Sequence, residues 1–341
     1  MSGIIKSQAI ELASNAVPLP SRAQQEAKIR GYFDASLSEN TRKNYLSILH
    51  RYVNAGYRLP SSLDEVLVYL STAADTCRPS ALSVHRAAIS QWHQFNEFPD
   101  PTKTKQVDML MKGIRKKHRQ PPKRAYALSI DEVANILSCL KVEPTAIQAV
   151  RDAALVAIGY FACLRASELV GLHVDDLNFS KDGVVLSIRA SKTDQDGQGL
   201  LRGVPRTNGS LCPVSLLQRW LSASRIEQGP VFRSLNRWHQ LSAKALSTNS
   251  VSQVVQRCAK QAGVREWESV SSHSLRRGFA TSASRIGADF GAIKRQGGWQ
   301  KDDTVRVYIE EGEILQDNAA LPLLDALSEF SHPRQKLDDS K

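Results

Sequence analysis

The sequence predicts a mainly α-helical protein of two domains, with a small β-sheet in the second domain. Three observations lead to this class. The length of 341 residues exceeds the roughly 100–200 residues of a single domain. Apolar residues recur at helical spacing along most of the chain, first between residues 38 and 118. By contrast, residues 183–190, GVVLSIRA, form a short apolar run after Asp and Gly, which is typical of a strand.

The first third of the chain predicts a flexible arm followed by four helices. Residues 1–30 contain two prolines and little periodicity, so we expect an arm without sustained helix. Helix starts are typically marked by Ser or Thr, which precede each periodic stretch here, and by acidic residues in the first turn, which the second stretch has. The predicted helices begin at Ser38 or Asn40, at Ser62, at Ser80 and near Thr102, and the last ends near His118.

The second domain is predicted to begin near Leu128. Ser129 and Glu132 fit a capping box for a helix to Leu140. Residues 151–164 are apolar on most sides, which indicates a buried helix. Residues 194–210 are polar and predict turns. Further helices are expected at about 214–224, 250–262, 274–286, 289–296 and 303–309, then an amphipathic stretch 311–329 interrupted at Pro322, and a polar tail 331–341.

The charge is strongly positive and partly concentrated. The chain carries 45 Lys and Arg against 34 Asp and Glu, a net charge of +11. Such an excess favours an anionic partner, most often nucleic acid. Between Met109 and Ile130 there is no acid, and Pro121–Pro122 forbid a continuous helix. We interpret this stretch as a helix end and a DNA-tracking linker at 119–127; a solvated helix tail is the alternative. Its basic residues are Lys112, Arg115, Lys116, Lys117, Arg119, Lys123 and Arg124.

Several classes of protein are excluded by absent patterns. No run of about 18 apolar residues could span a membrane, and the N-terminal apolar stretch is too short for a secretory signal. The five cysteines are odd in number and form no Cys-x-x-Cys pair, so we expect free thiols in a reducing cytosol. No phosphate-binding glycine loop or His-Glu-x-x-His motif occurs, and we expect no nucleotide or metal cofactor.

The segment 271–309 carries the residues that suggest chemistry. His273 and Arg276 lie three residues apart at a helix start, where both can face one small anion. The pair Gly297–Gly298 allows a tight turn after a short helix. A following helix, capped by an Asp, places Tyr308 about a turn and a half beyond its start.

These motifs resemble the tyrosine recombinase (phage integrase) family. The segment has His-x-x-Arg, then Gly-Gly-Trp at Trp299, then Tyr308 nine residues later. Upstream, CLRASELVGLHVDDL matches the family's first arginine motif through Arg165 and Glu168, and RASKTD matches its lysine hairpin through Lys192. The resemblance covers roughly residues 30–330, in the simple two-domain layout of Cre-like and Xer-like members.

The resemblance implies a role for each motif residue. Tyr308 would attack a DNA phosphorus to give a 3′-phosphotyrosine, with Arg165 and Arg276 on the non-bridging oxygens. Lys192 would be the general acid, and His273 would move protons at the nucleophile. Glu168 would orient its neighbours, and Trp299 would donate its indole N–H to phosphate. Many members have His at the position of Trp299. A Trp can donate a hydrogen bond but cannot shuttle a proton.

The resemblance also implies domains and partners. A helical core-binding domain would cover residues 31–118 and a mixed α/β catalytic domain residues 128–330. Expected partners are double-stranded DNA with an inverted-repeat site, three further protomers in a homo-tetramer, and accessory proteins. The stretch 311–329 would dock into a neighbouring protomer or pack on its own domain. The protein would be cytoplasmic, encoded by a bacterium or phage, and associated with the nucleoid.

Three other functions stay open on the sequence alone. A type IB topoisomerase or telomere resolvase would use the same chemistry without exchanging strands between duplexes. A sequence-specific DNA-binding regulator would need no Tyr308 hydroxyl. An architectural nucleic-acid-binding protein would bind without regard to sequence.

Overall fold

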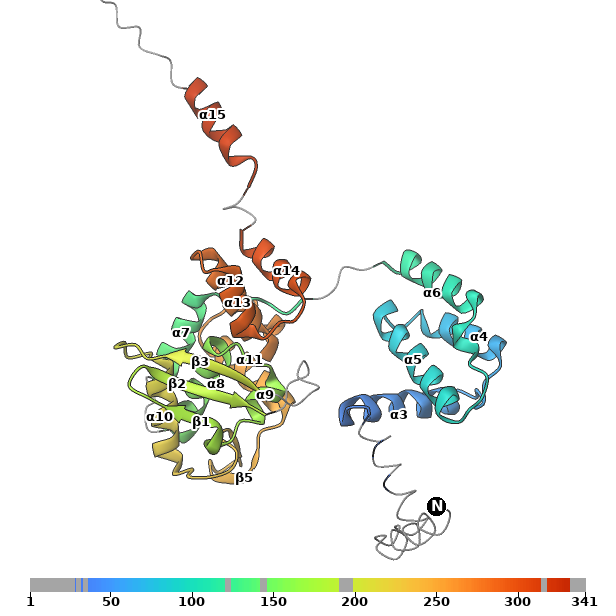
Figure 1. The fold of residues 1–341 in the computed structure, drawn as a ribbon, viewed down its shortest axis with the longest axis horizontal. Coiled ribbons are helices and arrows are strands. Elements are labelled where there is room, and N and C mark those ends of the chain that lie inside the picture. The colour runs from blue at the N-terminus through green and yellow to red at the C-terminus, as the bar shows by residue number, and fades with distance from the viewer. Residues whose placement is uncertain are drawn as a thin grey trace, which may run out of the picture. The chain divides into compact units, whose positions relative to one another are not determined.

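The computed structural model describes residues 28, 32, 36–119, 124–141, 146–189, 199–313 and 318–331. The chain forms two compact units, residues 1–122 and 123–341. Most of the described residues are helical, with two small antiparallel sheets in the second unit. The mainly α fold class is therefore confirmed (Figure 1). In the described parts of the chain, no helix combines the length and the apolar character needed to cross a bilayer.

The N-terminal unit contains four α-helices that pack around tyrosine and aliphatic side chains. Ser38 and Ser62 cap their helices through hydroxyls that accept N–H bonds from Thr41 and Glu65, as predicted. Buried core residues include Tyr52, whose ring lies edge-on to Tyr69 at 4.6 Å between centroids. The elements are α3 (Glu39–Asn54), α4 (Leu63–Ala73), α5 (Pro79–Phe95), the 3-10 turn η1 (Pro101–Lys103) and α6 (Lys105–Lys117).

Two predicted helix starts in this unit are wrong. The third helix, α5, begins at Pro79 with Arg78 as its N-cap, not at Ser80. Proline suits the first helical position because the N–H that it lacks has no partner there. The fourth helix begins at Lys105, not near Thr102, because the Thr104 hydroxyl accepts from the Val107 N–H and separates α6 from η1.

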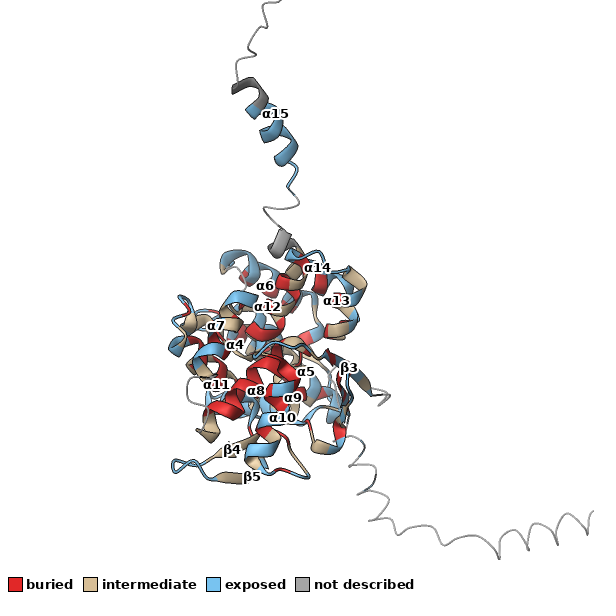
Figure 2. Ribbon diagram, turned by 90° about the vertical axis from the view of Figure 1, so that its left-hand side faces the viewer, coloured by how far each residue is buried: buried red, intermediate tan, exposed pale blue. Residues whose placement is uncertain are grey.

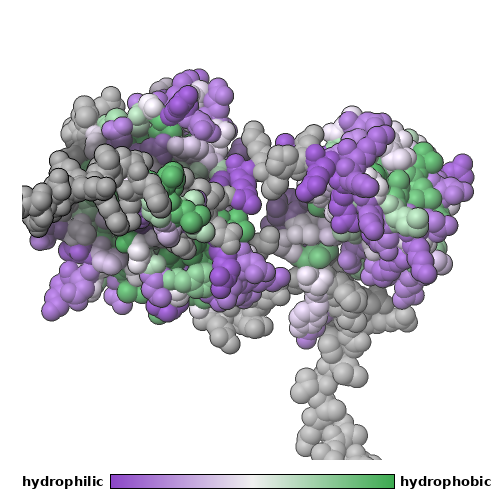
Figure 3. Space-filling model, turned by 90° about the horizontal axis from the view of Figure 1, so that it is seen from above, coloured by the Kyte–Doolittle hydropathy of each residue, from purple (hydrophilic) through white to green (hydrophobic). Residues whose placement is uncertain are grey.

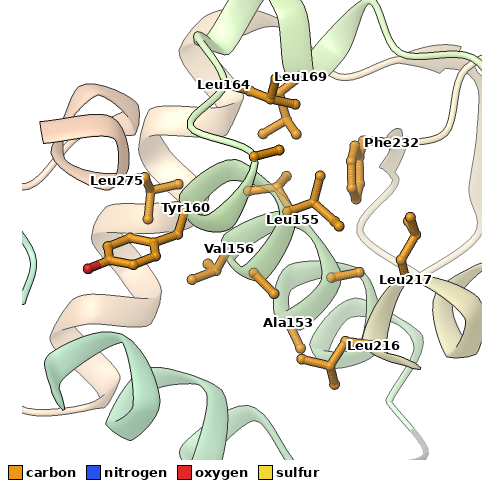
Figure 4. Packing of buried hydrophobic residues seen from close by; sticks show 14 of the residues in the cluster. Ala153, Leu155, Val156, Tyr160, Leu164, Leu169, Leu216, Leu217, Phe232 and Leu275 are labelled. Atoms are coloured by element: carbon orange, nitrogen blue, oxygen red, sulfur yellow. The ribbon is translucent and has the colours of Figure 1, made fainter. Parts of the chain in front are cut away.

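The second unit is built around α8 (Ile147–Phe161). Every residue from Ala149 to Tyr160 is buried, and Figure 2 shows the helix red along its length. Leucine and aromatic side chains from other elements pack against it (Figure 4). The remaining helices are α7 (Ile130–Lys141), α9 (Ala166–Val170), α10 (Pro213–Ser224), α11 (Thr248–Gln261), α12 (Ser272–Arg285), α13 (Phe290–Gly297), α14 (Asp302–Glu313) and α15 (Leu321–Ser331), with 3-10 turns η2 (Val174–Asp176) and η3 (Trp267–Ser269).

The β-structure is more extensive than the one strand that the pattern predicted. Strand β2 (Gly183–Ile188) lies between β1 (Leu177–Phe179) and β3 (Leu200–Pro205), with Leu186 opposite Arg202. Strand β3 lies inside the stretch 194–210, which was predicted as turns. Its inward positions hold Arg202 and Val204, so the usual apolar alternation is missing. A second sheet pairs β4 (Arg233–Leu235) with β5 (Leu241–Ala245).

Close backbone approach fixes the start of this unit against α12. A Cβ added to Gly278 would overlap the Leu128 carbonyl. Leu128 and Ser129 can therefore lie against α12, where the Leu128 N–H donates to the Ser274 carbonyl at 3.4 Å. Ser129 and Glu132 form the predicted reciprocal cap of α7. This contact joins α7 to the helix that carries His273 and Arg276.

The last helix differs from its prediction. The predicted interruption is present but lies before Pro322: α14 ends at Glu313 and α15 begins at Leu321. Pro322 itself occupies the first turn of α15, where its missing N–H costs nothing. The described part of α15 is exposed throughout, as the pale blue in Figure 2 shows. Its exposed leucines are Leu321, Leu323, Leu324 and Leu327.

Candidate active site

The two ends of the predicted segment meet at Tyr308. His273 lies in the first turn of α12 and Tyr308 lies on α14, and their Nε2 and Oη atoms are 3.1 Å apart. Thr281, two turns further along α12, donates its hydroxyl to the Tyr308 carbonyl at 3.3 Å. Helix α12 thus contacts Tyr308 of α14 at both its main chain and its hydroxyl. The predicted proximity of His273 to Tyr308 is present.

The charge around His273 is positive. The ring is exposed to the pocket, yet its pKa is lowered, first by partial desolvation against its neighbours and then by nearby arginines. Those arginines are Arg276, Arg277 and Arg165. Each raises the energy of a protonated imidazole, so a neutral ring is favoured near pH 7. A neutral Nε2 can accept the Tyr308 proton.

Arg276 is buried behind this pair. Only 2% of the residue is exposed. Its Nη1 donates to the Cys163 carbonyl and its Nη2 to the Gly297 carbonyl, each at 2.5 Å. Cys163 has φ +53°, a left-handed conformation that is uncommon outside glycine. The two carbonyls thus hold the guanidinium from the C-terminal ends of α8 and α13.

Trp299 packs between the arginine and the tyrosine. The residue is 7% exposed. The Arg276 Cζ lies 4.1 Å from the centre of its ring, and the Tyr308 ring centre lies 5.8 Å away. A Cβ added to Gly297 would overlap the indole ring, and Gly298 has φ +59°. The glycine pair thus makes room for the Trp299 ring and for the left-handed end of α13.

Arg165 and Glu168 form a second charged pair at the start of α9. The Arg165 Nη1 lies 2.5 Å from the Glu168 Oε1, and its backbone N–H donates to Oε2 at 2.9 Å. The Arg165 side chain is 22% exposed, whereas the Glu168 carboxylate is 1% exposed. The buried carboxylate therefore holds an arginine whose head still reaches solvent. Arg165 is close enough to Arg276 for their charges to interact.

Lys192 lies outside the described residues, since residues 190–198, between β2 and β3 in the chain, are not described. The structure brings together the other six predicted residues in one part of the second unit. Of the predicted basic contacts, Lys112, Arg115, Lys116 and Lys117 are exposed on α6, Arg119 and Arg124 are exposed, and Lys123 is not described. Hydrophilic side chains cover most of the visible face of the N-terminal unit in Figure 3, on the right.

Some residues of the site were not predicted. Arg277 and Arg124 line a pocket of about 460 Å³ with His273 and Tyr308. The Arg277 Nη1 donates to the Ala125 carbonyl. Gln296 donates to the carbonyls of Phe161 and Gly203, at 2.8 and 2.9 Å. The double arginine at 276–277 was a visible signal, but nothing local in the sequence indicates that Gln296 joins α13 to α8 and β3.

Comparison with known proteins defines the class. The family model described as "Phage integrase family" matches residues 127–313. An "Integrase/recombinase xerD homolog" from Selenomonas ruminantium is 34% identical over 265 residues, 76% of this chain and 77% of that protein. "Recombinase cre" of Escherichia phage P1 is 24% identical over 268 residues, 73% of this chain and 75% of its own.

Solved structures agree in fold. The XerH site-specific recombinase bound to palindromic difH substrate has a TM-score of 0.61 at 19% identity, covering 86% of this chain and 80% of its own. A lambda integrase dimer bound to a COC' core site has a TM-score of 0.56 at 16% identity, covering 92% and 83%. The chain belongs to the phage integrase family. It is a tyrosine recombinase, and the expected family and enzyme class are confirmed.

Proposed function

We propose that this protein is a site-specific recombinase that cuts and rejoins double-stranded DNA without metal or ATP. One observation carries the proposal: the Tyr308 hydroxyl lies at hydrogen-bond distance from His273, beside the buried Arg276. A nucleophile, a base and a phosphate-binding cation thus lie together. The family resemblance supplies the reaction in which such a set acts on DNA.

In the cleavage step, the Tyr308 oxygen attacks a backbone phosphorus. A new bond joins phosphorus to the phenolic oxygen, and the bond from phosphorus to the 5′-oxygen breaks. The phenolic proton passes to the His273 Nε2, 3.1 Å away, and the 5′-oxygen receives a proton from Lys192. The energy of the phosphodiester is kept in the 3′-phosphotyrosine, so rejoining needs no cofactor.

The arginines stabilise the charge that develops on the phosphate. Arg165 and Arg276 would contact the non-bridging oxygens, because guanidinium groups match the geometry of two oxygens. The hydrogen bonds that Arg276 donates to the carbonyls of Cys163 and Gly297 hold it in place before DNA binds, so little reorganisation is needed in the transition state. Glu168 orients Arg165, and Trp299 packs on Arg276 and offers its indole N–H.

Substrate binding is assigned to both units. The helical domain at 31–118 and the linker at 119–127 would track the DNA backbone through the basic residues on and after α6, and the catalytic domain at 128–330 would hold the scissile phosphate. Such contacts release counterions, so affinity should fall about a thousandfold between 50 and 200 mM salt. The DNA site would carry inverted repeats, and the protein would act in the cytoplasm at the nucleoid.

Strand exchange through a Holliday junction requires four protomers on two sites, and accessory proteins could act on this assembly. The exposed leucines of α15 offer one half of a contact between protomers. An apolar pocket of about 540 Å³, lined among others by Phe161, Phe279 and Ile293, offers the other half. Apolar surface of this kind is favourably removed from water by a partner.

The test is a covalent protein–DNA adduct. The protein is incubated in EDTA with duplexes drawn from DNA beside its own gene, each nicked near the centre so that the cleaved end diffuses away. A denaturing gel should show a shifted band for wild type and none for Tyr308→Phe. Tyr57→Phe removes a tyrosine hydroxyl of the other unit and should leave the band unchanged.

The same assay separates the alternatives. Wild type that binds a duplex tightly and forms no adduct would favour a non-catalytic regulator. Binding that is indifferent to sequence would favour an architectural protein. Adduct formation with products joined only within one duplex would favour a topoisomerase or telomere resolvase. Recombinant strands drawn from two differently labelled duplexes are the result expected here.

A further inference from the structure

Strand β3 places a charged side chain on its buried face. Arg202 and Val204 point inward while their neighbours Leu201, Gly203 and Pro205 are exposed. Only 3% of Arg202 is exposed. Arginine is rarely buried to this extent without a partner. An inward arginine in a short strand therefore needs an explanation.

The hydrogen bonds of Arg202 are incomplete. Its Nη1 donates to the neighbouring Leu201 carbonyl at 3.1 Å. Its Nε and Nη2 are buried and have no hydrogen-bond partner among the residues that the structure describes. Most buried polar groups in native proteins are paired, so each exception suggests strain or a function. Burial also lowers the pKa of this guanidinium.

The other buried arginines of this unit are held differently. Arg151 donates Nε and Nη2 to the Asp152 carboxylate at 2.9 and 2.8 Å, and Nη1 to the Arg233 carbonyl. Arg276 donates to two carbonyls. Within the described residues, Arg202 makes no ion pair with a carboxylate. The same unit can therefore satisfy a buried arginine, and it does not do so for this one.

Arg202 belongs to a group of like charges. Its charge interacts with those of Glu168 and Arg165, and also with that of Arg276. Glu168 is already bonded to Arg165. Among the described residues, three guanidinium groups thus interact with one carboxylate, and this group of four has a formal excess of two positive charges. Such an excess is unfavourable in a buried site unless an anion joins it.

The Arg202 head also supports the turn before Trp299. A Cβ on Gly298 would overlap the Nη2 atom and crowd Cζ, so the guanidinium lies directly against this glycine. On the same strand, the Gly203 carbonyl accepts from Gln296. Strand β3 therefore holds residues 296–298 at two places, and Gly297 in turn accepts from Arg276.

We propose that Arg202 is a positioning residue of the cleavage site, whose charge stays uncompensated until a DNA phosphate binds. The inference rests on the proposed function and adds a residue to it. Attack by Tyr308, with its proton on His273, gives a phosphorane with one more negative charge than the bound phosphodiester, and a further guanidinium near the phosphorus stabilises that added charge. The buried charge of Arg202 is unfavourable in the free protein, and it stabilises the transition state once DNA is bound.

The test uses Arg202→Met, which keeps the length and removes the charge. Without DNA, the variant should melt at the same temperature as wild type or higher, because an uncompensated cation is gone. With saturating nicked duplex, the adduct should form at least about tenfold more slowly, and the Kd for the duplex should rise, because a bound phosphate no longer compensates a buried cation. In the Tyr308→Phe background, DNA should raise the melting temperature less when Arg202 is also replaced.

Arg151→Met is the matched control. It removes a buried arginine whose hydrogen bonds are satisfied by a carboxylate and a carbonyl, so it should lower the melting temperature. The rate of adduct formation per folded molecule should stay within about twofold of the wild-type rate. Arg202→Met behaving as this control would overturn the inference, because the role would be structural. Arg202→Lys tests charge where the Met variant folds poorly: it should recover part of the DNA-dependent gain in melting temperature. No recovery would refute the electrostatic role.

The two proposals fail separately. An absent adduct with wild type would contradict the proposed function, whereas the melting temperatures with and without bound duplex would still report on Arg202. An adduct that forms equally fast in wild type and Arg202→Met would contradict the inference alone.

Discussion

The Nε2 atom of His273 lies 3.1 Å from the phenolic oxygen of Tyr308, although 35 residues separate them in the chain. The two side chains come from different helices, α12 and α14. Desolvation, and after it the charges of the nearby arginines, lower the pKa of His273. The imidazole is therefore held neutral beside the hydroxyl whose proton it would accept.

This relationship predicts how cleavage depends on pH. A base with a lowered pKa stays neutral further into acid, so the rate should fall only below pH 6.5, the ordinary histidine value. Single-turnover adduct formation is measured from pH 4.5 to 8.5. His273→Gln should react more slowly and lose the acid limb of the profile. An acid limb that survives unchanged in this variant would assign the titration to another group.

Arg276 is predicted to affect both stability and cleavage. Arg276→Ala leaves the Cys163 and Gly297 carbonyls without their donor, at about 1–3 kcal/mol for each buried group. Cleavage should be abolished while duplex binding persists, as read by adduct assay and gel shift.

Arg165→Ala should also abolish cleavage and spare binding. Because the Arg165 side chain is partly exposed, the comparison of the two variants separates loss of phosphate contact from loss of internal support. Full activity in either variant would refute the assignment of both arginines to the phosphate.

Lys192 is predicted to protonate the leaving group. Lys192→Ala should cleave ordinary duplex slowly, because the 5′-oxygen is then expelled without a proton. A duplex with sulfur at the bridging 5′ position needs no such proton, so the variant should cleave it at close to the wild-type rate. Tyr308→Phe should cleave neither substrate. Failure of the sulfur to rescue the lysine variant would exclude the general-acid role.

The C-terminal helix is predicted to act in assembly. Deletion of residues 318–341 should leave binding of one protomer to a half-site intact and abolish cooperative binding to the full site. A double change, Leu323→Glu with Leu327→Glu, places charge on residues that are 72% and 61% exposed, so the fold should be kept. Gel-shift titration reads both variants, and unchanged cooperativity would contradict the docking role.

Much of the helical fold could be predicted because its signals are local. Ser62 with Glu65, and Ser129 with Glu132, cap helices through bonds between residues three apart. The buried helix α8 is apolar on most sides, so its burial could be predicted without knowledge of its partners. The short strands were harder to predict, since β3 carries Arg202 at an inward position and depends on β2 for its pairing.

By itself, the sequence determined most of the helices and the positive charge, and it predicted the motif residues from Arg165 to Tyr308. Those properties depend on side-chain type and on spacings of a few residues. Only the tertiary structure decided which groups meet. His273 reaches Tyr308, Gln296 reaches Phe161 and Gly203, and Arg202 comes to lie beneath Gly298. The physical reason is that packing around α8 sets these contacts across as many as 135 residues of chain, a distance over which no local pattern carries information.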